Sequence, residues 1–151
     1  MSRASWYARQ LDTYRLEREI ERRLSWITGH RRIIAITKRE LNERGMLSRQ
    51  YDNPVFCEDE DLLSTTLSKH PYTGDDPEWS LLSALLQLAI CKRLVRSYGG
   101  ELRRRKGKKA FVAPANINFS DERIAAFKKS VKLIQGKKEP QKAVGREGEK
   151  A

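Results

Sequence analysis

The sequence predicts a mainly α-helical protein of about five helices with one β-hairpin, over residues 101–113. Long stretches carry apolar side chains at intervals of three and four residues, which is the period of a helix. Residue types that cap or terminate helices stand at the ends of those stretches. The segment "ELRRRKGKKAFVA" instead places a glycine between two short limbs with apolar outer ends, which favours a hairpin. We expect one domain over residues 1–136.

The first predicted helix covers residues 5–28. Its inward stripe consists of Tyr7, Leu11, Tyr14, Leu16, Ile20, Leu24 and Ile27. The arginines on its outer side alternate with glutamates, so we interpret that side as a solvent-exposed face with salt bridges. The pair Gly29-His30 is expected to interrupt the helix.

Two interpretations of residues 31–44 stay open. The segment "RRIIAI" is rich in β-branched residues and favours a short strand at 31–36. A capping-box pattern from Thr37 to Glu40 would then begin a helix that ends at Gly45. The alternative is a single helix from Arg31 through Arg44.

The remaining helices have clear boundary signals. Asp52-Asn53-Pro54 indicates a turn, and four carboxylates at 58–61 suit the positive end of a helix that reaches residue 70. Asp76-Pro77-Glu78 predicts the start of a central helix that Gly99 ends.

The last predicted helix begins after Ser120 and ends at Gly136. Residues 137–151 have almost no apolar content, which predicts a disordered basic tail.

The net positive charge of the chain indicates an anionic binding partner. The chain of 151 residues has 31 Lys and Arg against 20 Asp and Glu, a formal net charge of +11. Residues 1–50 sum to +6, residues 51–100 to −4 and residues 101–151 to +9. Nucleic acid is therefore the first candidate partner, and an acidic protein or membrane surface the next.

Several function classes lack their usual residues. Cys57 and Cys91 are isolated, and the two histidines have no nucleophile or carboxylate beside them in the sequence. A glycine-rich phosphate loop is also missing. The helix-start role explains the acidic run at 58–61 without a metal. We expect no enzyme activity, no cofactor and no metal.

The longest apolar stretch, residues 81–91, is interrupted by polar side chains, so we expect no membrane span. The predicted location is the cytoplasm, at the nucleoid in a bacterial host, with the nucleus left open.

The predicted hairpin has an apolar base and a cationic tip. A two-residue turn at Lys106-Gly107 would place Arg105 opposite Lys108 and Arg104 opposite Lys109, and a four-residue loop from Arg105 to Lys108 is the alternative. Like-charge pairs across a hairpin are destabilising by a few tenths of a kcal/mol to about 1 kcal/mol, which indicates an anionic ligand.

Three groups of cations make up the predicted nucleic-acid surface. The candidates are Arg103, Arg104, Arg105, Lys106, Lys108 and Lys109 in the hairpin and Lys92, Arg93 and Arg96 on the preceding helix, with Arg31, Arg32, Lys128, Lys129 and Lys132 as a secondary basic surface.

A helix that ends in "CKRLVRSYGG", followed by "ELRRR", a basic turn and "KAFVAP", resembles the last helix and wing of winged helix-turn-helix DNA-binding proteins. The resemblance covers residues 78–114 and implies that the hairpin cations lie along the phosphate backbone of a duplex. A second fragment, "TKRELNERGMLSRQY" at 37–51, resembles the second helix, the turn and the start of the recognition helix in that class.

The expected function is non-enzymatic binding of nucleic acid, duplex DNA above RNA, through phosphate contacts. The alternative is a small adaptor or inhibitor, for example from a virus or mobile element, that docks on a larger nucleic-acid-processing machine.

Overall fold

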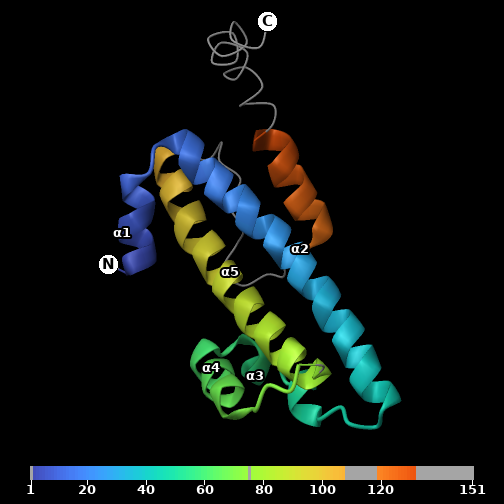
Figure 1. Ribbon diagram of the computed structural model, residues 1–151. Helices are drawn as coiled ribbons and strands as arrows, with labels where there is room; N and C mark the ends of the chain where they lie inside the picture. The colour runs from blue at the N-terminus through green and yellow to red at the C-terminus, as the bar shows by residue number, and fades with distance from the viewer. Residues whose placement is uncertain (1, 75, 108–118, 132–151) are drawn as a thin grey trace, which may run out of the picture. The chain divides into compact units, whose positions relative to one another are not determined.

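A computed structural model describes residues 2–74, 76–107 and 119–131 of the chain (Figure 1). Within these residues the structure is helical and contains no strand. The elements are α1 (Arg3–Gln10), α2 (Thr13–Glu43), the 3-10 helix η1 (Arg49–Asp52), α3 (Pro54–Glu58), α4 (Glu60–Lys69), α5 (Pro77–Lys106) and a helix over residues 121–131. The mainly helical class is confirmed.

The chain divides into two compact units. Unit 1 combines Met1–Arg22 with Val95–Ala151, and unit 2 is the continuous segment Arg23–Leu94. Both α2 and α5 contribute one part to each unit. The single domain expected over residues 1–136 stays a prediction.

In unit 1, α1 lies beside the C-terminal end of α5 (Figure 1). The buried side chains of this unit include Ala8, Leu16, Ile20, Val95, Tyr98, Leu102, Ile124, Phe127 and Val131. The guanidinium of Arg105 donates to the carbonyl oxygens of Ala8 at 3.2 Å and Arg9 at 3.3 Å. Since the last carbonyls of a helix have no partner within it, this cation caps the C-terminus of α1.

In unit 2, α3 and α4 lie beside the N-terminal part of α5 (Figure 1). Its core cluster consists of Leu41, Tyr51, Phe56, Leu63, Leu81, Leu82, Leu85 and Ala89. The Tyr51 and Phe56 rings meet edge to face with their centroids 5.9 Å apart. The core therefore joins α2, η1, α3, α4 and α5 within this unit.

Several predicted helix boundaries are confirmed. The Oδ1 atom of Asp76 accepts hydrogen bonds from the backbone N–H groups of Glu78 at 2.9 Å and Trp79 at 3.3 Å, so it is the N-cap of α5. Ser120 Oγ accepts from Arg123 N at 3.3 Å in the same role.

Gly45 ends α2 as predicted. It has a φ of +69°, which an L side chain rarely adopts. The N–H of Met46 donates to Leu41 O at 2.9 Å, and the N–H of Gly45 donates to Asn42 O at 3.0 Å. This pair of hydrogen bonds is a Schellman motif, which satisfies carbonyls that the helix itself leaves without partners.

The predicted break at Gly29-His30 and the strand at 31–36 are wrong. Helix α2 runs through both, in agreement with the alternative of a helix from Arg31 to Arg44. The chain breaks earlier, at Leu11-Asp12, where Asp12 Oδ1 accepts from Arg15 N at 2.8 Å. Buried Ile27 and half-buried Ile34, seven residues apart, keep the apolar stripe in register across the glycine.

The predicted β-hairpin at 101–113 is also wrong, because its first limb is the last turn and a half of α5. The helix passes through Gly99 and Gly100 and stops at Gly107, which has a φ of +65°. A glycine inside a helix costs about 1 kcal/mol relative to alanine. Burial of Leu102 and the hydrogen bonds of Glu101 with the next turn offset that cost. Residues 108–113 lie outside the described part.

No helix in the described residues is long and apolar enough to cross a membrane. The expected tail at 137–151 lies outside the described residues. The predicted location stays a prediction.

Candidate anion-binding site

Charge is divided unequally between the two units. Unit 1 contains 21 Lys and Arg against 10 Asp and Glu, and unit 2 contains 10 of each kind. The entire net charge of +11 therefore belongs to unit 1. An anionic partner would therefore be attracted electrostatically to unit 1.

Three of the predicted hairpin cations make contacts inside unit 1. Arg104 donates to both carboxylate oxygens of Glu101, at 2.9 and 2.7 Å, and Arg105 Nε donates to Glu101 Oε2 at 2.7 Å. Lys106 Nζ donates to Glu17 Oε2 at 2.6 Å. Arg103 is exposed and pairs with no carboxylate among the described residues. Much of the basic run thus compensates two buried glutamates.

The predicted cations on the central helix have different surroundings. Lys92 Nζ lies 3.5 Å from Glu58 Oε1, and Arg93 Nε lies 2.6 Å from Glu60 Oε2. Both pairs lie in unit 2 and use carboxylates of the acidic run. Arg96 belongs to unit 1, and its guanidinium carbon is 5.3 Å from the centroid of the Phe119 ring.

The secondary basic residues also divide between the units. Arg31 is half-buried and Arg32 is exposed in unit 2, whereas Lys128 is half-buried and Lys129 is exposed in unit 1. Lys108, Lys109 and Lys132 lie outside the described residues.

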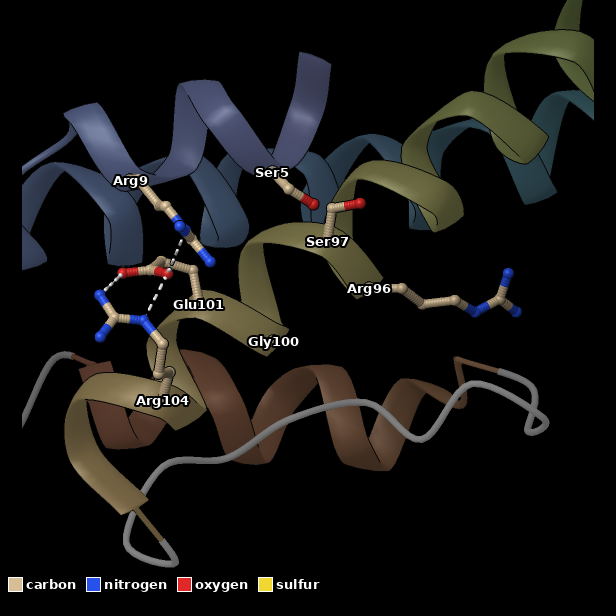
Figure 2. A pocket seen from close by; sticks show the side chains of 7 residues that line it. All are labelled: Ser5, Arg9, Arg96, Ser97, Gly100, Glu101 and Arg104. Carbon is tan, nitrogen blue, oxygen red and sulfur yellow. Dashed lines mark hydrogen bonds and ion pairs between the residues drawn. The ribbon is translucent and has the colours of Figure 1, made fainter. Parts of the chain in front are cut away.

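Unit 1 contains a pocket of about 310 Å³ between α1 and α5 (Figure 2). Its lining residues are Ser5 and Arg9 from α1 and Arg96, Ser97, Gly100, Glu101 and Arg104 from α5. In Figure 2 the two serines lie in the middle, Arg9, Glu101 and Arg104 meet on one side, and Arg96 extends to the other. Three arginines and two hydroxyls in one concave site can hold an anion.

Glu101 is the one carboxylate in this lining, and its side chain is only 5% exposed. The hydrogen bonds from Arg104 outweigh the opposing effect of burial and, together with those from Arg105, lower the pKa of Glu101 from 4.5 to about 2. The group is therefore ionised at neutral pH. With three arginines around it, the lining has a formal charge of +2.

The arginines of the pocket keep donors for a ligand. Arg9 Nε is 3.8 Å from Glu101 Oε1, which is too long for a hydrogen bond, and half of the Arg9 side chain is exposed. Arg104 uses two nitrogens on Glu101 and leaves Nη1 without a hydrogen bond among the described residues. Arg96 Nε is buried and has no hydrogen-bond partner among them.

The sequence prediction missed Ser5, Arg9, Ser97, Gly100 and Glu101. One signal was present, because Glu101 stands three and four residues before Arg104 and Arg105, the spacing of ion pairs along a helix. Nothing local to α1 indicates that Arg9 meets Glu101, 92 positions later in the chain.

A histidine in unit 2 has the carboxylate partners that the sequence did not indicate. His70 Nε2 lies 2.7 Å from Asp76 Oδ2, and His70 Nδ1 lies 3.4 Å from Glu78 Oε1. Burial alone would raise the pKa of Asp76, but its hydrogen bonds with His70 and with backbone N–H groups lower it below the ordinary value. The described residues contain no cluster that could hold a metal ion.

Comparison of the chain with models of protein families, with curated proteins and with solved structures finds no match. The resemblance to winged helix-turn-helix proteins stays a prediction based on residues 78–114, without the hairpin that it implied.

Proposed function

We propose that this chain is a non-enzymatic nucleic-acid-binding protein that contacts the phosphates of duplex DNA through unit 1. The single observation that supports it best is the location of the whole net charge of +11 in that unit. A protein that neutralises phosphates releases condensed counterions, so a net positive charge gives affinity without base-specific contacts.

The ion pairs within unit 1 limit which cations can contact a phosphate. Glu101 and Glu17 already hold Arg104, Arg105 and Lys106. Exposed Arg103, Arg123 and Lys129 extend from unit 1 into solvent. Lys108 and Lys109 follow Arg103 closely in the sequence and belong to the proposed contact set with it.

The test measures binding of a 20-base-pair duplex by fluorescence anisotropy over a range of salt concentrations. The variant Arg103→Ser/Lys108→Ser/Lys109→Ser removes three proposed phosphate contacts. Because each contact contributes about 0.9 to the slope of log affinity against log salt, we expect the slope to become shallower by about 2 to 3.

The matched control is Arg39→Ser/Arg49→Ser/Lys69→Ser, which removes three exposed cations from unit 2. It should leave the slope nearly unchanged. Equal slopes for the two variants would contradict a phosphate surface in unit 1.

A second candidate function is docking on a protein partner through unit 2. Trp26, Ile33 and Ile36 of α2 are 46%, 43% and 53% exposed. Ile33 also lines a cavity of about 210 Å³ together with His30, Trp79 and Ala84. This surface belongs to the unit with no net charge, so a Trp26→Ser/Ile33→Ser variant should lose partner capture and keep duplex binding.

A further inference from the structure

We propose that the pocket between α1 and α5 in unit 1 binds a phosphate monoester, held by Arg9 and Arg104, with Arg96 adding positive charge to the lining from the other side. The inference deepens the proposed function where the ligand is the terminal phosphate of a nucleic acid. A free phosphate ester has the same chemistry, and the experiment below separates these two sources.

The donor set favours an oxyanion with several oxygens. Arg9 forms no hydrogen bond with the described residues through its guanidinium, and Arg104 keeps Nη1 available beside it. Figure 2 shows both groups on the same side of the pocket, with Ser5 and Ser97 between them and Arg96. Arginine and hydroxyl donors together match the acceptor oxygens of a phosphate group.

The charge of the lining favours a monoester over a diester. Three arginines and one ionised glutamate sum to +2. A phosphate monoester carries a charge of about −1.5 to −2 at neutral pH, whereas each backbone phosphate of a nucleic acid carries one negative charge. The monoester neutralises the lining, and the diester leaves part of its charge uncompensated.

The pocket also contains an unsatisfied donor. Arg96 Nε is buried, lacks a hydrogen-bond partner among the described residues and belongs to a side chain of the lining. A buried N–H without a partner is unfavourable. A ligand oxygen reaches this N–H only when the Arg96 side chain leaves the Phe119 ring, over which its guanidinium lies.

Gly100 gives the ligand room. A Cβ atom built on Gly100 would meet nothing within 4 Å, and the residue lies inside α5 without a positive φ. Alanine at this position would therefore occupy pocket space and, at the same time, favour the helix. If Gly100→Ala binds the ligand more weakly, unfolding of the variant cannot be the cause.

The experiment compares two duplexes that differ only in a 5′-phosphate or a 5′-hydroxyl end. The native chain should bind the phosphorylated end at least tenfold more tightly, since hydrogen bonds to charged groups contribute about 1.5–3 kcal/mol each. Arg9→Gln should abolish this preference, and Gly100→Ala should reduce it. Arg3→Gln, which removes an exposed cation from the same helix outside the pocket, should keep it.

Competition with a mononucleotide monophosphate and with inorganic phosphate identifies the source. If millimolar monophosphate removes the preference, the ligand is a free phosphate ester, and if it does not, the ligand is a nucleic-acid end.

The two proposals can fail separately. Equal affinity for the two duplexes together with no binding of the monophosphate, or a preference that survives Arg9→Gln, would overturn the pocket inference, and a steep salt slope would leave the proposed function standing. Monophosphate binding without salt-dependent duplex binding would overturn the proposed function and leave the pocket.

Discussion

Two buried glutamates hold three cations of unit 1 in hydrogen bonds within the fold. Glu101 is hydrogen-bonded to Arg104 and Arg105, and Glu17 to Lys106. Removing one partner of a buried ion pair is costly because it leaves an uncompensated charge. Arg104, Arg105 and Lys106 therefore stabilise the folded protein, whether or not they also contact a ligand.

Glu101 makes the stability of the protein depend on pH in a defined window. Its folded pKa is about 2 and its ordinary pKa is 4.5, so its contribution is complete above pH 4.5 and is lost as the pH falls toward 2. We expect Glu101→Gln to lower the free energy of unfolding by about 3 kcal/mol at pH 7 and by much less at pH 2.5. Urea unfolding of both chains at the two pH values measures this.

The pKa of Asp76 is also lowered, so this residue too loses its contribution to stability as the pH falls through the acidic range. Comparing the native chain with Glu101→Gln at each pH separates the effect of Glu101 from that of Asp76. A Glu101→Gln effect of the same size at both pH values would show that Glu101 acts without its charge.

At the scale of elements, some glycines in this chain end a helix and others lie inside one, and the local sequence does not distinguish the two cases. Gly45 and Gly107 end helices with a positive φ. Gly29 and Gly100 lie inside α2 and α5. The difference at the second pair comes from the surrounding residues, since apolar or ion-pairing side chains continue in helical register across Gly29 and Gly100.

Gly29→Ala tests the continuous α2. A Cβ at this position meets nothing within 4 Å, and alanine is favoured over glycine in a helix by about 1 kcal/mol. We expect the free energy of unfolding to rise by about 0.5 to 1 kcal/mol in urea titrations. A chain that breaks at Gly29 predicts a loss, so a destabilised variant would contradict the helix.

At the scale of the whole molecule, the net charge belongs to one unit, while exposed apolar side chains occur in both, with Trp6 and Tyr7 in unit 1. Unit 1 has all the net positive charge, whereas exposed Trp26, Ile33 and Ile36 belong to unit 2. A duplex that binds by charge should therefore contact unit 1 and slow amide exchange there, while exchange in unit 2 stays unchanged.

Hydrogen exchange with and without duplex DNA tests this division. We expect slower exchange of amides within residues 2–22, 95–107 and 119–131 and no change within 23–94. The same measurement at 1 M salt is the control, because binding through phosphates is lost there. Equal protection of the two units would assign the contact to both.

Sequence predicts the parts of this structure that depend on neighbours in the chain. The caps at Asp76 and Ser120 and the stop at Gly45 belong to this class, because their hydrogen bonds join residues at most five positions apart. The extent of α5 past Gly99 depends on burial of Leu102 and on partners in α1. Tertiary contacts of this kind override local propensity.

The candidate site shows the same limit. The basic run at 103–106 is visible in the sequence, but its partner Glu17 lies 89 positions before Lys106. The pocket brings Ser5 and Arg9 against α5 from the other end of the chain. No spacing rule relates such residues, so the site could be assembled only from the fold.

The discontinuous composition of unit 1 has a consequence for synthesis on the ribosome. Met1–Arg22 emerges before unit 2, but Arg105, which caps the end of α1, emerges about 100 residues after that helix. Unit 2 is a continuous segment that leaves the ribosome complete in between, and domains generally fold as units during synthesis. Residues 1–22 therefore gain their α5 partners only after unit 2 has been synthesised, so unit 2 can fold before unit 1 is complete.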